Sequence, residues 1–259
     1  MGGVPGPVQS IERAAAILRL LARGSGRHSL GEVAGSLGLA RGTAHGILRT
    51  LQGVGFVEQD EATGKYQLGA ALLHLGTSYL DVNELRSRAI NWADALAARS
   101  GEAVRIGTSL DGQVLVVHHV FRPDDTLQAL DVGTLVPLHA TALGKVLLAY
   151  DTSVAAELAA KPELTAYSRH TITSPPVLTR ALKEIRDRGW AAEAEEFTVG
   201  DAGVAAPIRG HGGLVVGAIG ISGAVERICD VRGRPQPKLV TFVRDAARAV
   251  SRDLGASRW

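Results

Sequence analysis

Hydrophobic residues at the start of the chain recur every three or four positions, which is the spacing of one buried helical face. Three such stretches follow one another and predict short helices over 11–22, 30–37 and 41–52. Ser10 precedes the first stretch, and Ser29 precedes the second, with a glutamate three residues further on. A serine at such a position accepts hydrogen bonds from first-turn amides. Both residues are therefore predicted N-caps, the second within a capping box.

The turns that follow these helices indicate a small, complete domain. Gly38 comes directly after the second helix, where a left-handed backbone favours glycine. Beyond the third helix, residues 56–59 and 65–68 flank a polar tip and predict a β-hairpin. Three short helices followed by a hairpin are typical of a winged helix-turn-helix, which we place at residues 8–69. The alternative is a three-helix subdomain whose polar face is merely solvated.

The outward face of the third predicted helix carries arginine, threonine and histidine and no carboxylate. A helix that enters the major groove needs such donors for phosphates and base edges. The charge distribution agrees, because residues 1–53 hold six arginines and two glutamates, a net charge of +4, whereas the other 206 residues sum to −2. The predicted DNA-contacting residues are Arg41, Gly42, Thr43, His45, Arg49, Thr50 and Lys65.

Residues 70–83 continue with two apolar stripes at helical spacing and predict a linker helix. One stripe runs from Leu68 to Tyr79, and the other contains Leu73 and Leu80. A helix with two apolar edges contacts more than its own small domain. It either pairs with a second chain or packs against the following domain.

The rest of the chain, residues 84–256, predicts a mainly antiparallel sheet with flanking helices, so the fold class is α+β. Asp111-Gly112 between two hydrophobic runs is a strong hairpin signal. The predicted helices span 84–99, 141–150, 154–160, 178–188 and 238–254. The predicted strands span 103–110, 114–120, 127–132, 190–193, 204–208 and 214–222.

Composition excludes several protein classes. A hydrophobic fraction of 46% and a charged fraction of 21% are typical of a globular protein with a substantial core. One cysteine, Cys229, permits no intramolecular disulfide and no cysteine-cluster metal site. The N-terminus lacks the features of a signal peptide, and no apolar run approaches the length of a membrane helix. We therefore expect a cytoplasmic protein with no membrane contact.

The sequence contains no motif of nucleophilic, phosphate-binding or metal-dependent catalysis, so we expect no catalytic residues, no metal and no cofactor. His118 and His119 are neighbours on a predicted strand and point to opposite faces, so they cannot chelate one ion. One of them is expected in the interior or in a pocket. Glu195 and Glu196 are a candidate carboxylate pair, although solvation at the surface is the expectation. Cys229 is expected to be buried or half-buried.

Two stretches are suited to receive a small ligand. Residues 137–145 lead into a helix start with small side chains, where amides and the helix dipole favour an anion, especially at 141–144. Residues 193–206 place Glu193 and Gly203 beside a predicted buried strand, and Ser222 ends another. The alternative is that these glycines serve only turns and that the helix only packs.

Several motifs resemble the IclR-type transcriptional regulators over residues 8–256. They are Ser10-Ile-Glu-Arg-Ala, Leu39-Ala-Arg-Gly-Thr-Ala-His, Tyr66-Gln-Leu-Gly, Pro137-Leu-His-Ala-Thr-Ala-Leu-Gly-Lys, Glu195-Glu-Phe and Val204-Ala-Ala-Pro-Ile. Three further stretches resemble the glycerol operon regulators of actinomycetes within that family. They are Gly42-Thr-Ala-His-Gly-Ile-Leu-Arg-Thr-Leu-Gln, Ser78-Tyr-Leu-Asp-Val and His118-His-Val-Phe-Arg-Pro-Asp-Asp.

The resemblance implies a winged-helix DNA-binding domain, a linker helix and an effector-binding domain of GAF-like topology. It also implies a homodimer or dimer of dimers that represses a catabolic operon through a double-stranded operator. Gly46, Gly203 and Gly220 depart from the family, where arginine, cysteine or serine, and serine are common. The effector-binding positions implied by the family and by the helix start are Thr141, Ala142, Leu143, Gly144, Glu193, Gly203 and Ser222.

The effector suggested by this resemblance is glycerol 3-phosphate or glycerol. A phosphate would rest at 141–144, assisted by a basic side chain whose identity the sequence leaves open. The candidates are Arg105, His118, His119 and Lys145. Three alternatives remain: a regulator that responds to another small acid or aromatic metabolite, a structural DNA-binding protein without an effector, and an enzyme with a DNA-binding head. The enzyme would use Glu193 or Glu195 with His118 or His139.

Overall fold

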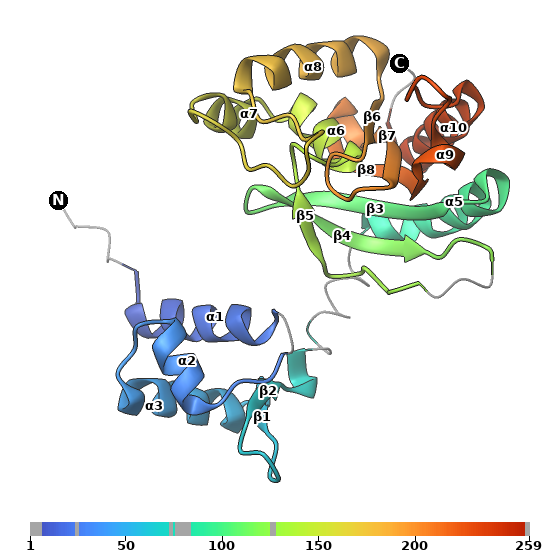
Figure 1. Cartoon of the computed structure of the whole chain (residues 1–259). Coiled ribbons are helices and arrows are strands. Elements are labelled where there is room, and N and C mark those ends of the chain that lie inside the picture. The colour runs from blue at the N-terminus through green and yellow to red at the C-terminus, as the bar shows by residue number, and fades with distance from the viewer. Residues whose placement is uncertain (1–6, 24–25, 73–74, 76–83, 125–127, 257–259) are drawn as a thin grey trace. The chain divides into compact units, whose positions relative to one another are not determined.

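The computed structural model describes residues 7–23, 26–72, 75, 84–124 and 128–256. The chain divides into two compact units, Met1–Val82 and Asn83–Trp259. Figure 1 shows both units, and each is described by itself below.

The first unit contains three helices and a two-stranded antiparallel hairpin. The helices are α1 (Gln9–Leu21), α2 (Leu30–Ser36) and α3 (Arg41–Gly53), and the strands are β1 (Val57–Gln59) and β2 (Tyr66–Leu68). The apolar stripes of these elements meet in one core, made by Ile17, Leu21, Val33, Leu48, Leu51, Val57 and Tyr66. The predicted order of three helices followed by a hairpin is confirmed.

The local signals in this unit were predicted with one error. The capping box is present, since the Ser29 amide donates to Glu32 Oε2 at 2.6 Å and the Glu32 amide donates to Ser29 Oγ at 3.3 Å. Gly38 adopts the predicted left-handed backbone with φ 62°. Ser10 is not an N-cap, because α1 begins one residue before it and Val8 takes the capping position without a side-chain hydrogen bond.

The predicted linker helix over 70–83 falls mostly outside the described residues. Residues 70–72 and 75, which are described, are helical.

The second unit is built on a six-stranded antiparallel sheet in the order β5-β4-β3-β8-β7-β6. The strands are β3 (Ala103–Leu110), β4 (Gln113–Val120), β5 (Leu135–Pro137), β6 (Ala191–Ala194), β7 (Asp201–Arg209) and β8 (Val215–Ala224). The helices are α5 (Glu84–Ser100), α6 (Ala142–Tyr150), α7 (Thr152–Ala159), α8 (Pro175–Arg188), α9 (Val225–Ile228) and α10 (Pro237–Asp253), with a 3-10 turn η1 (His211–Gly213).

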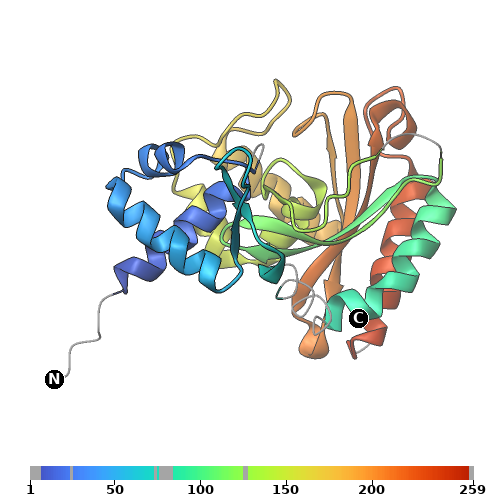
Figure 2. The same ribbon diagram turned by 90° about the horizontal axis from the view of Figure 1, so that it is seen from below.

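Alternation along the strands gives the sheet two different faces. On one face, a Cβ added to Gly217 would lie 2.5 Å from Leu85 of α5. On the other face, a Cβ added to Gly107 would lie 3.7 Å from Leu143 of α6. Helices α5 and α10 lie side by side on the first face (Figure 2), and α6 covers the second, with α7 and α8 packed outside it.

The hairpin signal at Asp111-Gly112 is confirmed, since both residues have positive φ, 48° and 72°, and join β3 to β4. The predicted strand over 127–132 is wrong for the described residues 128–132, which form no strand. Instead, β5 pairs with the start of β4. The Asp131 amide donates to the side-chain Nδ1 of His119 on β4 at 3.2 Å and not to a backbone carbonyl of that strand. The remaining helices and strands are confirmed with shifted ends, and the short α9 was not predicted.

Candidate functional site

The exposed face of α3 carries the predicted DNA-contacting side chains. The exposed residues are Arg41, Gly42, His45, Arg49 and Thr50. Thr43 is half-buried, as is Lys65, which directly precedes the second strand of the hairpin. The inward residues Ala44, Leu48 and Leu51 are buried and anchor the helix to the core. The basic side chains of α3 therefore lie on the solvent-exposed face of a helix whose other face is packed in the core.

The amino end of α3 has no side-chain cap. Its N-cap is Ala40, which has no side-chain oxygen, and no acidic residue lies in the first turn. Helix α2 differs, because Ser29 and Glu32 close its amino end. An uncapped helix start presents amide donors and the positive end of the helix dipole, which suit a phosphate group.

The second unit contains a cavity of about 420 Å³ between the amino end of α6 and the adjacent face of the sheet. Six of the seven predicted effector positions line it: Thr141, Ala142, Leu143, Glu193, Gly203 and Ser222. Prediction missed Asp131, Phe197 and Asp201, which also line the cavity. Phe197 and Asp201 lie within the stretch 193–206 that was expected to receive a ligand, but neither was named, and no motif marks Asp131.

Gly144 does not line the cavity and has a packing role. A Cβ at this position would lie 2.4 Å from the Leu138 Cα, so only glycine lets α6 approach that segment. Its amide donates to Thr141 Oγ1 at 3.1 Å, and the same hydroxyl donates to the Pro137 carbonyl at 2.7 Å. The two first-turn amides before it, on Ala142 and Leu143, precede the intrahelical hydrogen bonds and belong to lining residues.

Glu193 is the buried acid of the cavity. Burial raises the pKa of its carboxyl to about 7, although its Oε2 accepts a hydrogen bond from the Glu196 amide at 3.1 Å. Gly203 faces it across the β6–β7 pair, and a Cβ there would lie 3.4 Å from Glu193 Oε1. The cavity thus holds a carboxyl group that changes protonation near neutral pH.

Substitution Glu193→Gln should stabilise the protein at pH 8 and have little effect at pH 5. A carboxyl with a raised native pKa favours folding at low pH, and this contribution is lost as pH rises from about 4.5 through about 7. The full difference is about 3 kcal/mol at 1.36 kcal/mol for each pKa unit. Urea unfolding at both pH values measures it. An equal effect of the substitution at pH 5 and pH 8 would contradict the assignment.

The four basic residues that were candidates to assist a phosphate occupy different environments. Arg105 lines the cavity. Lys145 is buried and forms an ion pair with Glu196. His119 pairs in register with Arg105, whereas His118 pairs with Ile106 and projects from the face covered by α5. The prediction that the two histidines point to opposite faces is confirmed, and burial lowers the pKa of both.

The expectation of solvation is wrong for Glu196, whereas Glu195 is half-buried. Glu196 is only 9% exposed because Lys145 holds its carboxylate, and Thr171 Oγ1 donates to its carbonyl at 2.6 Å. Glu195 has a positive φ of 58°, and its Oε1 accepts from the Gly200 amide at 3.0 Å. The two glutamates therefore shape the turn after β6. Cys229 is buried, as expected.

Of the acid–base pairs considered for an enzyme, His118 cannot meet Glu193. His118 and Glu193 project from opposite faces of the sheet, and His139 Nε2 lies 2.8 Å from the Thr165 carbonyl. Within the described ranges, no three His, Cys, Asp or Glu side chains gather as a metal site requires. None of the described helices combines the length and apolarity needed to cross a membrane.

Two protein families match this chain. Residues 10–61 match the IclR helix-turn-helix domain, and residues 77–252 match the bacterial transcriptional regulator IclR C-terminal domain. The chain belongs to the IclR family of transcriptional regulators. This confirms the family indicated by the sequence motifs and the α+β fold class.

Individual relatives of this IclR-family regulator align over nearly the whole chain. The glycerol operon regulatory protein of Streptomyces coelicolor is 57% identical, with 97% of this chain and 98% of that protein aligned. The protein of the same name from Streptomyces griseus is 54% identical over the same shares. The crystal structure of an IclR transcriptional regulator from Alicyclobacillus acidocaldarius matches with a TM-score of 0.81 and 28% identity, covering 95% of this chain and 99% of that one.

Proposed function

We propose that this protein represses a glycerol-type catabolic operon and leaves its operator when a small-molecule effector fills the cavity of the second unit. The observation that carries the proposal is the combination of a cavity at the predicted effector positions with full-length similarity to two proteins named as glycerol operon regulators. The effector is glycerol 3-phosphate or glycerol. The protein acts as a regulator and not as an enzyme, in the cytoplasm where its DNA lies.

The DNA contacts are assigned to the exposed face of α3 and to the hairpin. Arg41 and the uncapped first turn suit phosphates, whereas His45 and Arg49 lie further along the face that would enter the major groove. Gly42, Thr43, Thr50 and Lys65 complete the assigned contacts. A homodimer, or a dimer of dimers, would present two copies of α3 to a pseudo-palindromic operator.

The effector is assigned to the cavity beneath α6. Thr141, Ala142 and Leu143 contribute the helix start, and Glu193, Gly203 and Ser222 contribute the opposing sheet. Gly144 supports the helix start through packing. A ligand shifts an equilibrium between two conformations only by its different affinities for them, and coupling energies of about 1–3 kcal/mol are usual.

A gel-shift titration tests the proposal. The probes are duplexes from the region upstream of the protein's own gene and of adjacent catabolic genes, with a scrambled duplex as control. We expect binding that weakens about 5- to 150-fold when glycerol 3-phosphate or glycerol is added. Specific binding that neither compound changes would favour another effector. Failure to bind any duplex at low salt would overturn the proposed function.

A further inference from the structure

Arg105 is the one lysine, arginine or histidine among the described residues that line the cavity. It is the third residue of β3 and pairs with Gly220 of β8 and His119 of β4. The other three basic candidates do not line the cavity: Lys145 is held in its ion pair with Glu196, His118 lies on the far face of the sheet, and His119 is outside the lining. The structure therefore narrows four candidates to one.

The guanidinium of Arg105 is held in a fixed orientation. Its Nε donates to Asp131 Oδ2 at 2.6 Å, Nη2 contacts the same oxygen, and Nη1 donates to Ser222 Oγ. Asp131 is held in turn, because its amide donates to His119 Nδ1 and its carbonyl accepts from Thr134 Oγ1 at 2.7 Å. A group fixed in this way loses little conformational entropy when it binds a ligand.

The guanidinium retains donors for a ligand. Arginine has five N–H groups, and the contacts with Asp131 and Ser222 engage three of them. Two N–H groups therefore remain on a planar fork that suits the oxygens of a phosphate or carboxylate. The side chain is one-third exposed, so a ligand can reach it.

Two features of the other walls favour an anion, although three carboxyl groups also line the cavity. Ala142 and Leu143 bring the positive end of α6 to the cavity. Burial raises the pKa of Glu193 to about 7, so this carboxyl can take up a proton and donate a hydrogen bond. Asp131 balances the charge of Arg105, and Asp201 adds a further carboxylate to the lining. An anionic ligand therefore depends on Arg105, because the rest of the lining has carboxylates and no cationic side chain.

We propose that Arg105 binds the anionic group of the effector and thereby selects a phosphorylated polyol over the free polyol, with Asp131 and Ser222 positioning the guanidinium. This inference rests on the proposed function, because it takes the cavity to be the effector site. Beyond that function, it assigns ligand specificity to Arg105 and an anionic group to the ligand.

Isothermal titration of the full-length protein with glycerol 3-phosphate and with glycerol tests the proposal. We expect the wild type to bind glycerol 3-phosphate at least about tenfold more tightly, which is the scale of a charge-assisted hydrogen bond. The variant Arg105→Gln should lose most of this preference while its glycerol affinity changes less than about threefold. Arg105→Lys keeps the charge without the planar fork and should retain part of the preference.

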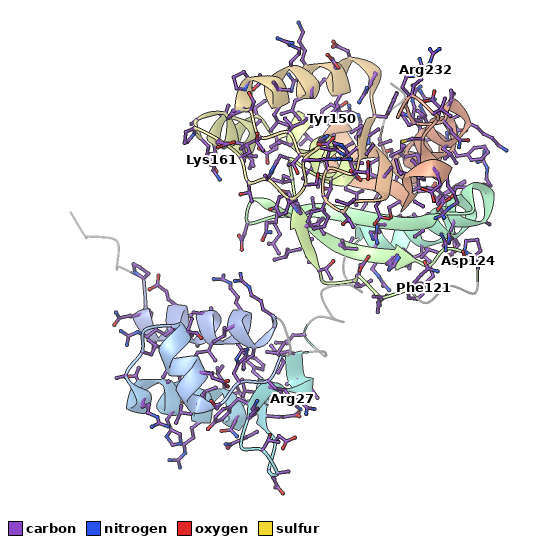
Figure 3. The ribbon with its side chains drawn as sticks, in the orientation of Figure 1. Arg27, Phe121, Asp124, Tyr150, Lys161 and Arg232 are labelled. Carbon is purple, nitrogen blue, oxygen red and sulfur yellow. The ribbon has the colours of Figure 1, made fainter. Side chains whose placement is uncertain are left out.

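Matched variants separate recognition from structural support. If Arg105 only held Asp131 and Ser222 in place, Arg105→Gln would weaken both ligands equally, and this outcome overturns the proposal. Arg232→Gln removes an exposed arginine from the turn between α9 and α10 (Figure 3) and should change neither affinity.

The possible failures are distinguishable. Arg105→Gln that keeps the full preference for glycerol 3-phosphate overturns the role of Arg105 and leaves the proposed function in place. Wild-type protein that binds glycerol as tightly as its phosphate also overturns the role of Arg105 alone. Wild-type protein that binds neither compound overturns this inference together with the effector named under the proposed function.

Discussion

Replacing Lys145 by methionine should lower the free energy of unfolding of the second unit by about 3–5 kcal/mol. Lys145 is 3% exposed and Glu196 is 9% exposed, so removal of the ammonium leaves a carboxylate in a site with little water. Glu196 Oε2 is buried and has no hydrogen-bond partner among the described residues, so the carboxylate depends strongly on Lys145. The loss combines the missing pair with the uncompensated buried charge.

Tryptophan fluorescence during urea unfolding measures this loss in the full-length protein. The first unit contains no tryptophan, and Trp92 and Trp190 lie in the second unit, so the signal reports on the second unit. Lys161→Met is the matched control, because Lys161 is exposed (Figure 3) and should change stability by less than about 0.5 kcal/mol. The double variant Lys145→Met with Glu196→Leu should recover most of the loss. A Lys145→Met variant as stable as the control would show that the pair contributes nothing.

Replacing Arg41 and Arg49 by alanine should each weaken operator binding about tenfold or more, and the double variant should bind like a non-specific protein. Both arginines lie on the exposed face of a helix that contains no acidic residue, so neither has a nearby carboxylate on that helix that would compete with DNA. An arginine that contacts base edges contributes about 1–3 kcal/mol and relaxes specificity when removed. An arginine that contacts phosphate lowers the slope of affinity against salt by about one.

Gel-shift titrations at several salt concentrations distinguish these two roles. Arg88→Ala is the control, since it removes the same charge from an exposed position on α5 in the other unit. We expect the control to retain wild-type affinity and salt slope. Unchanged affinity in both the Arg41 and the Arg49 variants would remove α3 from the DNA interface.

The sequence predicted those parts of the fold that short segments determine. The capping box at Ser29 and the left-handed Gly38 involve neighbours within three or four residues, and both are present. The strand predicted over 127–132 failed because the backbone amide of Asp131 bonds to a side chain twelve residues away. Hydrophobic alternation in a short segment cannot reveal such a competitor.

In the candidate site too, the sequence predicted individual residues but not the contacts between distant segments. The family resemblance located Glu193 and Ser222, because the pocket positions of the family fall on them, although neither lies within one of the resembling motifs. The grouping of Arg105 with Asp131 and Ser222 depends on strand register, since residues 26 and 117 positions apart meet there. The pair of Lys145 and Glu196 spans 51 residues, and the charged character of Glu196 alone suggested solvent. Local sequence therefore identified the chemical groups, and the tertiary fold determined which of them face one another.

The uncapped amino end of α3 should be less stable in the free protein than in the complex with DNA. Ala40 offers the opening turn of α3 no side-chain acceptor, so in the isolated protein this turn should unfold more readily than the start of α2. A backbone oxygen of the nucleic acid would supply the missing acceptor. The operator would then cap the helix, and amide hydrogen exchange at the start of α3 should slow when the duplex binds.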